Sequence, residues 1–294
     1  MTPSRTSLPV RAGAVLAVGA LTAALGTATA PSASAAPRTT WADADTAAIH
    51  PGVQMYTEGG QCTGNFVFTD ADGATYVGYA AHCAGTGEAT DTDGCEAGSL
   101  PLGTRVDFVE GGSLLGAGTR VGGGTLVYSS WLAMEATGET DADTCAYNDF
   151  ALVEVDAADA GDVNPSVPFH GGPVALATDG AAAGSTVYSF GNSSLRAGIE
   201  LLSPKVGLSL GQSGGGWTHS VYTLTPGVPG DSGSGFLDAQ GRALGTLSTL
   251  ALAPLPASNG VGDLSRELAY AQQHSGIAGL ALVPGTEPFR GLLG

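Results

Sequence analysis

A histidine, an aspartate and a serine occur along this chain in surroundings that suit acyl transfer. His82 follows two alanines and precedes a cysteine, Asp149 begins a short apolar run, and Ser232 lies inside the stretch Gly-Asp-Ser-Gly-Ser-Gly. A serine hydroxyl becomes an effective nucleophile at neutral pH when an imidazole accepts its proton and a carboxylate fixes the imidazole tautomer. The chain therefore offers a candidate nucleophile, a candidate general base and a candidate acid that orients the base.

Each of these residues also has a structural interpretation when it is taken alone, so the case for chemistry depends on the three together. Asp141 and Asp143 precede the candidate acid but lie in a polar turn, whereas Asp149 begins an apolar run that can bury a carboxylate. The remaining histidines lack comparable surroundings and are interpreted as structural: His50, His170, His219 and His274.

A different hydrolase fold uses a serine, an acid and a histidine in the reverse order, and Ser232, Asp263 and His274 follow that order. The α/β-hydrolases place the nucleophile in Gly-x-Ser-x-Gly on a turn between a strand and a helix. Here Ser234 stands at the position of the last glycine, and residues 236–241 have the pattern of a strand and a turn. The sequence therefore argues against an α/β-hydrolase.

The three motifs resemble the catalytic motifs of the trypsin/chymotrypsin-like serine proteases, in that family's chain order: Ala80-Ala81-His82-Cys83, Asp149-Phe150-Ala151-Leu152 and Gly230-Asp231-Ser232-Gly233. The resemblance implies a double six-stranded β-barrel. It also implies that His82 is the general base and then the general acid, that Asp149 orients it, and that Ser232 attacks the acyl carbon. The backbone N–H groups of Gly230 and Ser232 would hold the oxyanion.

Four cysteines lie in the first half of the chain, and an even number in an exported protein predicts two disulfides. Spacing alone leaves the pairing open. The resemblance implies that Cys83, beside the histidine, pairs with Cys62, and with it that Cys95 pairs with Cys145. The cysteines and histidines lack the spacing of a metal site, so we expect neither a metal ion nor a cofactor.

The stretches that this family uses to bind the substrate side chain depart here from the usual pattern. Pro226 lies six residues before the serine, in the stretch where an acid favours Lys or Arg substrates. The segment Ser248, Thr249 and Leu250 resembles the strand that forms the pocket wall, with Leu250 where the family often has glycine. The resemblance therefore implies a narrow pocket for small apolar side chains.

Asp231, directly before the serine, is the residue that in this family often pairs with a new N-terminus released by cleavage. The string Ile49-His50-Pro51-Gly52 resembles such a terminus only faintly, because a histidine stands where valine is usual. An internal partner for Asp231 is therefore the alternative.

Short segments rich in β-branched and aromatic residues alternate with turn signals, which is typical of an all-β sandwich or barrel. The predicted strands are 65–69, 75–79, 105–109, 150–155, 186–190, 221–225 and 243–248, and glycine clusters predict turns at 111–112, 122–124, 171–172 and 214–216. One C-terminal helix is predicted from Asp263 to His274, because Leu264, Leu268 and Ala271 recur at helical spacing. We expect this helix to pack on the domain's surface.

The N-terminal residues have the features of an export signal. Two arginines, an apolar stretch and the small residues Ala33-Ser34-Ala35 predict a secretory signal peptide over residues 1–35. The protease-like domain would then span residues 36–294, with barrels at about 49–160 and 161–294. The signal peptide holds two of the ten basic residues and none of the 27 acidic ones, so the exported chain carries a net charge of −19. This charge disfavours nucleic acids and anionic membranes as partners.

Two functions are compatible with these features. The first is a secreted, extracellular serine endopeptidase, a monomer that hydrolyses protein or peptide substrates through a His-Asp-Ser triad. The second is a weakly active or non-proteolytic protein of the same fold, acting as a binding module or an esterase. The presence of all three catalytic residue types favours the protease, because a binding module has no need of them.

Overall fold

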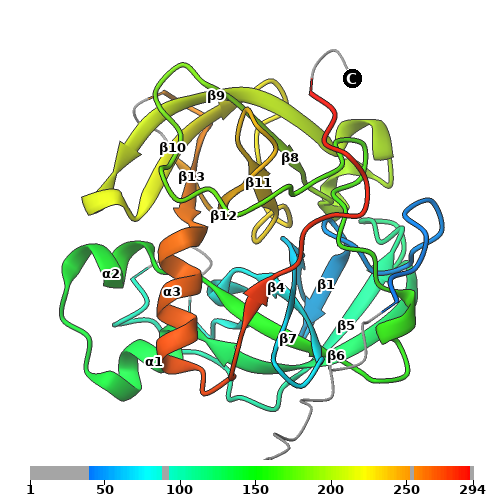
Figure 1. The fold of residues 1–294 in the computed structure, drawn as a ribbon, viewed down its shortest axis with the longest axis horizontal. Helices are drawn as coiled ribbons and strands as arrows, with labels where there is room; N and C mark the ends of the chain where they lie inside the picture. Colours follow the sequence, from blue (N-terminus) through cyan, green and yellow to red (C-terminus); the bar gives the residue numbers. More distant parts are fainter. Residues whose placement is uncertain (1–39, 88–92, 252–254, 292–294) are drawn as a thin grey trace, which may run out of the picture. The chain divides into compact units, whose positions relative to one another are not determined.

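Strands dominate the computed structural model, which describes residues 40–87, 93–251 and 255–291. These residues belong to the unit Ala36–Gly294, and the predicted signal peptide lies outside them. The strands form two sheets, and a single long helix lies near the end of the chain (Figure 1). The predicted all-β class and the C-terminal helix are therefore confirmed.

The second half of the chain forms a closed barrel of antiparallel strands, in the order β10-β13-β12-β11-β8-β9. Its strands are β8 (Thr186–Phe190), β9 (Pro204–Ser213), β10 (Thr218–Thr223), β11 (Gly235–Leu237), β12 (Ala243–Ala251) and β13 (Ser258–Asp263). Its core consists of apolar side chains from several strands, among them Val187, Val221, Phe236, Leu244 and Val261. This half has the six-stranded barrel that the resemblance implies.

The first half forms one eight-stranded sheet, in the order β14-β3-β4-β7-β6-β5-β1-β2, rather than a closed six-stranded barrel. Its strands are β1 (Gln54–Thr57), β2 (Gly60–Thr63), β3 (Val67–Thr69), β4 (Thr75–Tyr79), β5 (Arg105–Glu110), β6 (Thr119–Ser129), β7 (Ala151–Val155) and β14 (Ala281–Leu282). The additional edge strand β14 comes from the end of the chain, where Ala281 pairs with Thr69. It covers backbone groups of β3 that would otherwise stay unpaired at the sheet edge.

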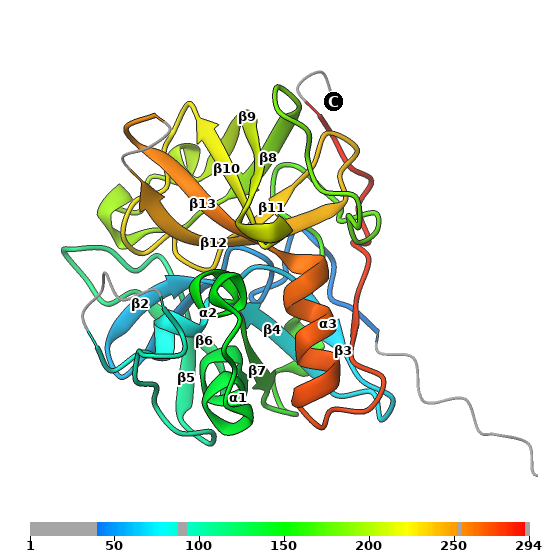
Figure 2. The same cartoon turned by 90° about the vertical axis from the view of Figure 1, so that its left-hand side faces the viewer.

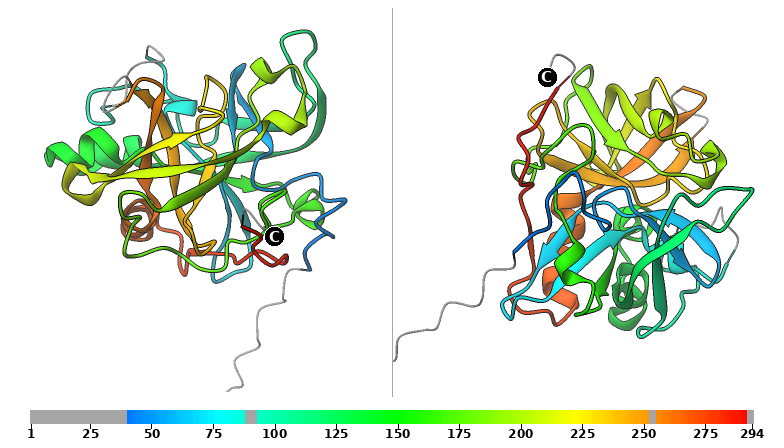
Figure 3. Two further views of the ribbon diagram at one scale, coloured as in Figure 1. Left: turned by 90° about the horizontal axis from the view of Figure 1, so that it is seen from above. Right: turned by 90° about the vertical axis from the view of Figure 1, so that its right-hand side faces the viewer.

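The segment after the C-terminal helix contacts the first sheet through β14, and its Phe289 ring packs on Tyr188 of β8 with 5.2 Å between ring centroids. Beyond β14, the N–H of Gly285 donates to the carbonyl oxygen of Pro173 at 2.8 Å, and the N–H of Arg290 donates to that of His170 at 2.6 Å. Figure 3 shows this segment, in red, running from the first sheet along the closed barrel. It therefore ties the two halves together at the edge of the domain.

Strand β6 runs through the glycine cluster 122–124, so the predicted turn at this position is wrong. Neighbouring atoms leave no room for side chains here. A Cβ on Gly124 would overlap the carbonyl oxygen of Glu154, and one on Gly122 would lie 2.8 Å from Ile49. Glycine allows a close approach of neighbouring chain segments inside the sheet instead of a change in chain direction.

The predicted helix is α3 (Leu264–His274). The Asp263 carboxylate caps it by accepting a hydrogen bond from the N–H of Arg266 at 3.1 Å. Leu264, Leu268 and Ala271 are buried, as their spacing predicts. None of the helices in the described residues has the length and apolarity needed to cross a bilayer.

Two short helices were not predicted, α1 (Ser130–Thr137) and α2 (Ala142–Tyr147). Asp141, expected in a polar turn, caps α2 by accepting a hydrogen bond from the N–H of Thr144 at 2.8 Å. Both helices are too short to display a helical repeat of apolar residues. Figure 2 shows them on the same side of the first sheet as α3, and α1 contacts α3.

Candidate active site

The candidate base and acid lie at the same end of two paired strands. His82 belongs to the single helical turn Ala81–Ala84 that follows β4, and Asp149 lies two residues before β7. Strands β4 and β7 are neighbours, with Tyr79 opposite Ala151. The Nδ1 atom of His82 lies 2.6 Å from Oδ2 of Asp149, and the backbone N–H of His82 donates to Oδ1 at 2.8 Å.

Asp149 is buried and held by a third donor. The hydroxyl of Ser248, on β12 of the other sheet, donates to Oδ2 at 2.6 Å. Burial opposes ionisation of Asp149, but the charge of His82 and the hydrogen bonds from His82 and Ser248 outweigh it and lower the pKa of Asp149. Burial also opposes the imidazolium form of His82, but the Asp149 carboxylate outweighs it and raises the pKa of His82. The pair therefore stabilises a proton on the imidazole.

The candidate nucleophile lies across a cleft between the two sheets. Ser232 and His82 both line this cleft, and the N–H of Thr63 in the first sheet donates to the carbonyl oxygen of Ser232 at 2.8 Å. In the part of the chain that the structure describes, the Ser232 hydroxyl makes no hydrogen bond to His82. Catalytic hydrogen bonds are often long without substrate and shorten when it binds. The two residues therefore share one site and leave space between them.

The turn that carries Ser232 leaves two backbone N–H groups available. The N–H groups of Asp231, Gly233 and Ser234 donate to backbone carbonyl oxygens. Within the described residues, those of Gly230 and Ser232 donate to no protein acceptor. Gly230 has a φ of +94°, and a Cβ there would overlap the side chain of Gln61. Glycine is therefore needed at 230 for the conformation that leaves these two donors available.

The carboxylate of Asp231 is completely buried and lies between two cations. Lys205 Nζ lies 2.9 Å from Oδ2 of Asp231, and the Arg196 guanidinium pairs with the same oxygen. The N–H of Ser193 donates to Oδ1 at 3.0 Å, and that of Val228 donates to Oδ2 at 3.1 Å. Asp231 therefore has internal partners that account for its charge. Burial lowers the pKa of Lys205, although Asp231 opposes this shift.

The chain around Ile49 pairs with the segment around Val163. Ile49 is buried and forms a parallel bridge with Val163, and the N–H of Ala42 donates to the carbonyl oxygen of Val163 at 3.0 Å. The chain before Ile49 thus also bonds to the segment around Val163.

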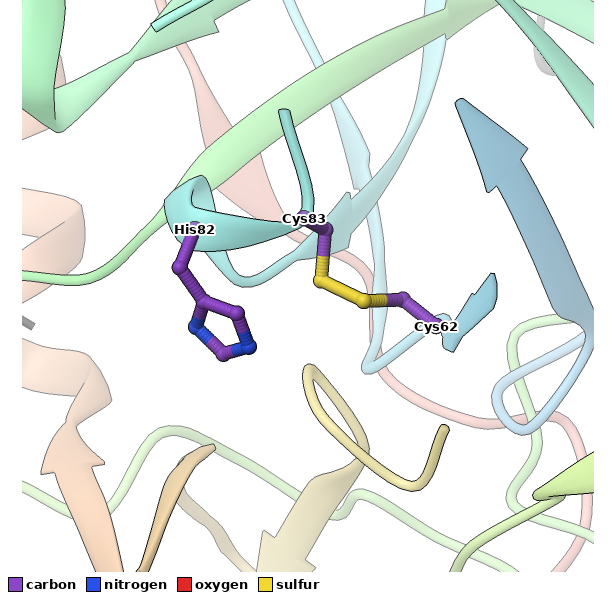
Figure 4. A group of neighbouring side chains, drawn as sticks. All are labelled: Cys62, His82 and Cys83. Atoms are coloured by element: carbon purple, nitrogen blue, oxygen red, sulfur yellow. A yellow bond between two sulfur atoms is a disulfide. The ribbon is translucent and has the colours of Figure 1, made fainter. Parts of the chain in front are cut away.

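Two disulfides are present, Cys62–Cys83 and Cys95–Cys145, the same pairs that the resemblance implies. Figure 4 shows that the His82 ring and the Cys83 sulfur project from the same helical turn, with Cys62 on the neighbouring strand β2. The disulfide therefore anchors the segment that carries the candidate base. Two groupings of the described residues have the proximity of metal ligands, and both contain these bonded cysteines. Their sulfur atoms are thus not available as thiolates.

The cleft walls near Ser232 include most of the predicted pocket residues. Ser248, Thr249 and Leu250 line the cleft, whereas Pro226 does not and its neighbour Gly227 does. The carbonyl oxygen of Pro226 instead accepts hydrogen bonds from the cations that hold Asp231. The carboxylate expected in a pocket for Lys or Arg is absent from the described residues that the closed barrel contributes to this lining.

Asn259, on β13, also lines the cleft and was not predicted. Its Oδ1 accepts a hydrogen bond from the N–H of Gly227 at 2.9 Å, and its Nδ2 donates to the carbonyl oxygen of Thr249 at 3.2 Å. The side chain thus links the two walls of the pocket and uses its polar atoms in doing so. An asparagine inside a strand gives no local signal of such a role.

Comparison with known proteins finds similar solved structures, and neither a protein-family model nor a curated protein matches the chain. Protease A of Thermobifida fusca is 17% identical, with 81% of this chain and 99% of that chain covered and a TM-score of 0.48. Cellulomonas bogoriensis chymotrypsin is 18% identical, with 80% and 98% covered and a TM-score of 0.45. A Nocardiopsis protease is also 18% identical, with 80% and 98% covered and a TM-score of 0.44. The names of these structures identify proteases, one of them a chymotrypsin, and the assignment of site residues rests on the geometry of this chain.

Proposed function

We propose that this chain is a secreted serine endopeptidase that hydrolyses peptide bonds through an acyl-enzyme on Ser232. The observation that carries the proposal is the bond between His82 and a buried Asp149, facing a cleft that Ser232 also lines. A buried carboxylate bonded to one ring nitrogen leaves the other nitrogen to accept the serine proton. A domain that only bound a partner would not need this arrangement.

The proposed reaction begins when Nε2 of His82 removes the hydroxyl proton of Ser232, whose oxygen attacks the scissile carbonyl carbon. Asp149 stabilises the imidazolium through Nδ1. The tetrahedral oxyanion accepts hydrogen bonds from the N–H groups of Gly230 and Ser232, each contributing about 3 kcal/mol to transition-state stabilisation. His82 then protonates the leaving amine, and a water molecule, activated by the same imidazole, hydrolyses the acyl-enzyme.

The proposed substrates carry small apolar side chains before the scissile bond. The barrel side of the pocket lining is uncharged in the described residues, and Leu250 and Leu247 contribute apolar surface. The Asn259 amide is already hydrogen-bonded to both pocket walls, through Gly227 and Thr249. Cleavage of a peptide library tests this preference. Fast cleavage after Lys or Arg would contradict it.

Activity of the proposed enzyme does not require a newly released N-terminus. The support is the neutralisation of Asp231 by Lys205 and Arg196, because a new terminus would be a third cation at one carboxylate. N-terminal sequencing of active secreted protein tests this point. A start at Ala36 is expected, and activity that appears only with a start at Ile49 would refute it.

Labelling with a fluorophosphonate probe tests the proposed function directly. We expect the folded protein to be labelled and the Ser232→Ala variant to remain unlabelled. Absence of labelling in the folded protein would favour a binding module instead. Labelling without cleavage of any peptide in a library would favour an esterase. The monomeric state and extracellular location belong to the same proposal and can be measured by light scattering and by fractionation of a culture.

A further inference from the structure

A further carboxyl group is completely buried close to Asp149. Glu267, in the first turn of α3, has no exposed surface. The hydroxyl of Thr246 donates to its Oε2 at 2.7 Å, and its Oε1 has no hydrogen-bond partner among the described residues. The carboxyl also faces the backbone of Asp149. No step of the proposed reaction uses this group, and burial of a carboxyl group is costly.

The fold makes space for this carboxyl group. Gly262 lies opposite Thr246 in the pairing of β12 with β13, and a Cβ at Gly262 would overlap Oε1 of Glu267. The side chain therefore lies over the Thr246–Gly262 pair. Such a site argues against an accidental burial of Glu267, because any other residue at 262 would displace it.

A chain of hydrogen bonds connects Glu267 to both sheets. Nδ2 of Asn65, between β2 and β3, donates to Oγ1 of Thr246 at 3.3 Å, and Thr246 in turn donates to Glu267. Asn65 belongs to the sheet that carries His82 and Asp149, whereas Thr246 belongs to the barrel that carries Ser232. The chain thus crosses the boundary between the two halves of the candidate site.

Strand β12 places two hydroxyl groups against two carboxyl groups. Thr246 donates to Glu267, and Ser248, two residues later, donates to Asp149. Asp149 accepts hydrogen bonds from the ring and the backbone N–H of His82 and from Ser248, whereas the one side-chain donor to Glu267 among the described residues is Thr246. An ionised carboxylate requires several donors when it is buried, so the negative charge belongs on Asp149.

We propose that Glu267 is a positioning residue for the catalytic acid, a neutral carboxylic acid that holds β12 through Thr246 so that Ser248 stays bonded to Asp149. The proposal rests on the proposed function of the triad. Because Glu267 is neutral, it adds no second negative charge beside the pair of His82 and Asp149.

The charged and titratable groups around Glu267 support its neutral form. Burial raises the pKa of Glu267 well above its usual range, and the negative charges of Asp149 and Asp263 add to the shift, although the hydrogen bonds from Thr246 and the backbone of Asp149 oppose it. Tyr128 on β6 is also close enough to interact, and burial raises its pKa well above the usual range. No described cation faces Glu267 among these interactions.

Three variants separate a positioning role from a general packing role. Glu267→Gln keeps the shape and the acceptor for Thr246, and we expect labelling of Ser232 within about threefold of wild type. Glu267→Leu removes every polar atom of the side chain, and Thr246→Val removes the hydroxyl that donates to Glu267 and accepts from Asn65. We expect these two variants to be labelled about tenfold more slowly, because Ser248 and Asp149 lose their alignment. Thr218→Val, a buried threonine of the same barrel bonded to Val261, is the matched control.

The pKa of His82, measured by NMR, supplies a reading that packing alone would not change. We expect the same value in wild type and Glu267→Gln, since one neutral group replaces another. A decrease of about one unit in Glu267→Gln would show that Glu267 is ionised and would overturn the proposal. Equal losses of labelling in Glu267→Gln and Glu267→Leu would also overturn the proposal. Wild-type labelling in both Glu267→Leu and Thr246→Val would overturn it as well.

The same measurements distinguish this inference from the proposed function. If wild type is folded but unlabelled at Ser232, the proposed function fails. The Nδ1 proton resonance of His82 then still reports its bond to Asp149 in each variant. If Glu267→Leu does not fold, Thr246→Val decides the result on its own. An unchanged resonance in Thr246→Val would overturn the positioning role.

Discussion

The two halves of the candidate site are held in place by different interactions. His82 and Asp149 belong to the first sheet, where the disulfide Cys62–Cys83 anchors the histidine segment. Ser232 belongs to the closed barrel, which follows all four cysteines in the chain. There, the buried ion cluster of Asp231 with Lys205 and Arg196 anchors the turn. One half thus depends on a covalent bond and the other on charge pairing.

This difference determines how each half should fail. A disulfide acts mainly by restricting the unfolded chain, so its loss lowers stability without leaving an unpaired charge. A buried ion cluster has a large desolvation penalty, and removing one partner leaves a charge without compensation. We therefore expect the barrel half to be more sensitive to single substitutions around its anchor than the first sheet.

The largest expected effect belongs to the first sheet and to chemistry rather than stability. In Asp149→Asn the amide no longer holds the His82 tautomer that accepts the serine proton, and labelling should slow by roughly 10³- to 10⁴-fold. Labelling kinetics measure this change, with circular dichroism as a check on the fold. Asp141→Asn is the matched control, because this exposed residue caps α2 and should leave the labelling rate unchanged. A loss below tenfold in Asp149→Asn would exclude Asp149 as the orienting acid.

The next effect tests the anchor of the barrel half. Lys205, the only lysine in the chain, has a fully buried side chain. We expect Lys205→Met to lower the free energy of unfolding by about 3 kcal/mol, because Asp231 keeps only Arg196 as a cationic partner. Urea denaturation measures the change. Arg120→Met, which breaks an exposed pair with Asp107, should lower it by about 1 kcal/mol or less. Equal losses in the two variants would contradict a special role for the buried cluster.

The disulfide of the first sheet should contribute a similar amount to stability, because it restricts the unfolded chain. Replacing Cys62 and Cys83 with alanine opens a loop of sequence separation 21, which should lower the free energy of unfolding by about 3 kcal/mol. Labelling should also slow, since Cys83 adjoins His82. The double variant without Cys95–Cys145 opens a loop of separation 50 and should lose about 4 kcal/mol. If both variants slow labelling equally, the first disulfide has no particular role in placing the base.

The sequence motifs predicted the residues that the structure brings together at the cleft, because acyl transfer requires particular residue types in fixed local settings. The helix α3 was predictable for a related reason, since its apolar residues repeat regularly. Glu267 falls on the same buried face, between Leu264 and Ala271, so an acidic residue at an apolar position was an available signal. Lys205, the single lysine in a strongly acidic chain, was an available signal of the buried ion cluster.

Other features depend on contacts between distant segments and had no local signal. In strand β6, Ile49 crowds Gly122 and Glu154 crowds Gly124, and neither neighbour lies nearby in the sequence. The eight-stranded first sheet depends on β14, a two-residue strand from the end of the chain. Asn259 links the two pocket walls because both Gly227 and Thr249 lie within hydrogen-bonding distance of its side chain. These features follow from packing in three dimensions rather than from composition or periodicity.

The smallest expected effect concerns one hydrogen bond, which links the two halves of the candidate site. Ser248, on the barrel, donates to Asp149, on the first sheet. The proposed reaction requires neutral His82, whose pKa Asp149 raises above 6.5. The labelling rate should therefore fall as the pH decreases through a midpoint above 6.5. In Ser248→Ala, Asp149 loses a donor and attracts the imidazolium more strongly, so the midpoint should rise by roughly half a unit.

The pH dependence of stability should run in the opposite direction. A His82 pKa that is higher in the folded than in the unfolded protein adds stability, which is fully present below the unfolded value. This contribution is lost as the pH rises through the folded value, the same range in which labelling becomes fast. Urea denaturation and labelling of wild type and Ser248→Ala over the same pH values measure both trends. A midpoint that moves down in Ser248→Ala would show that Ser248 does not stabilise the charge on Asp149, and the barrel would then support the base side of the site only through packing.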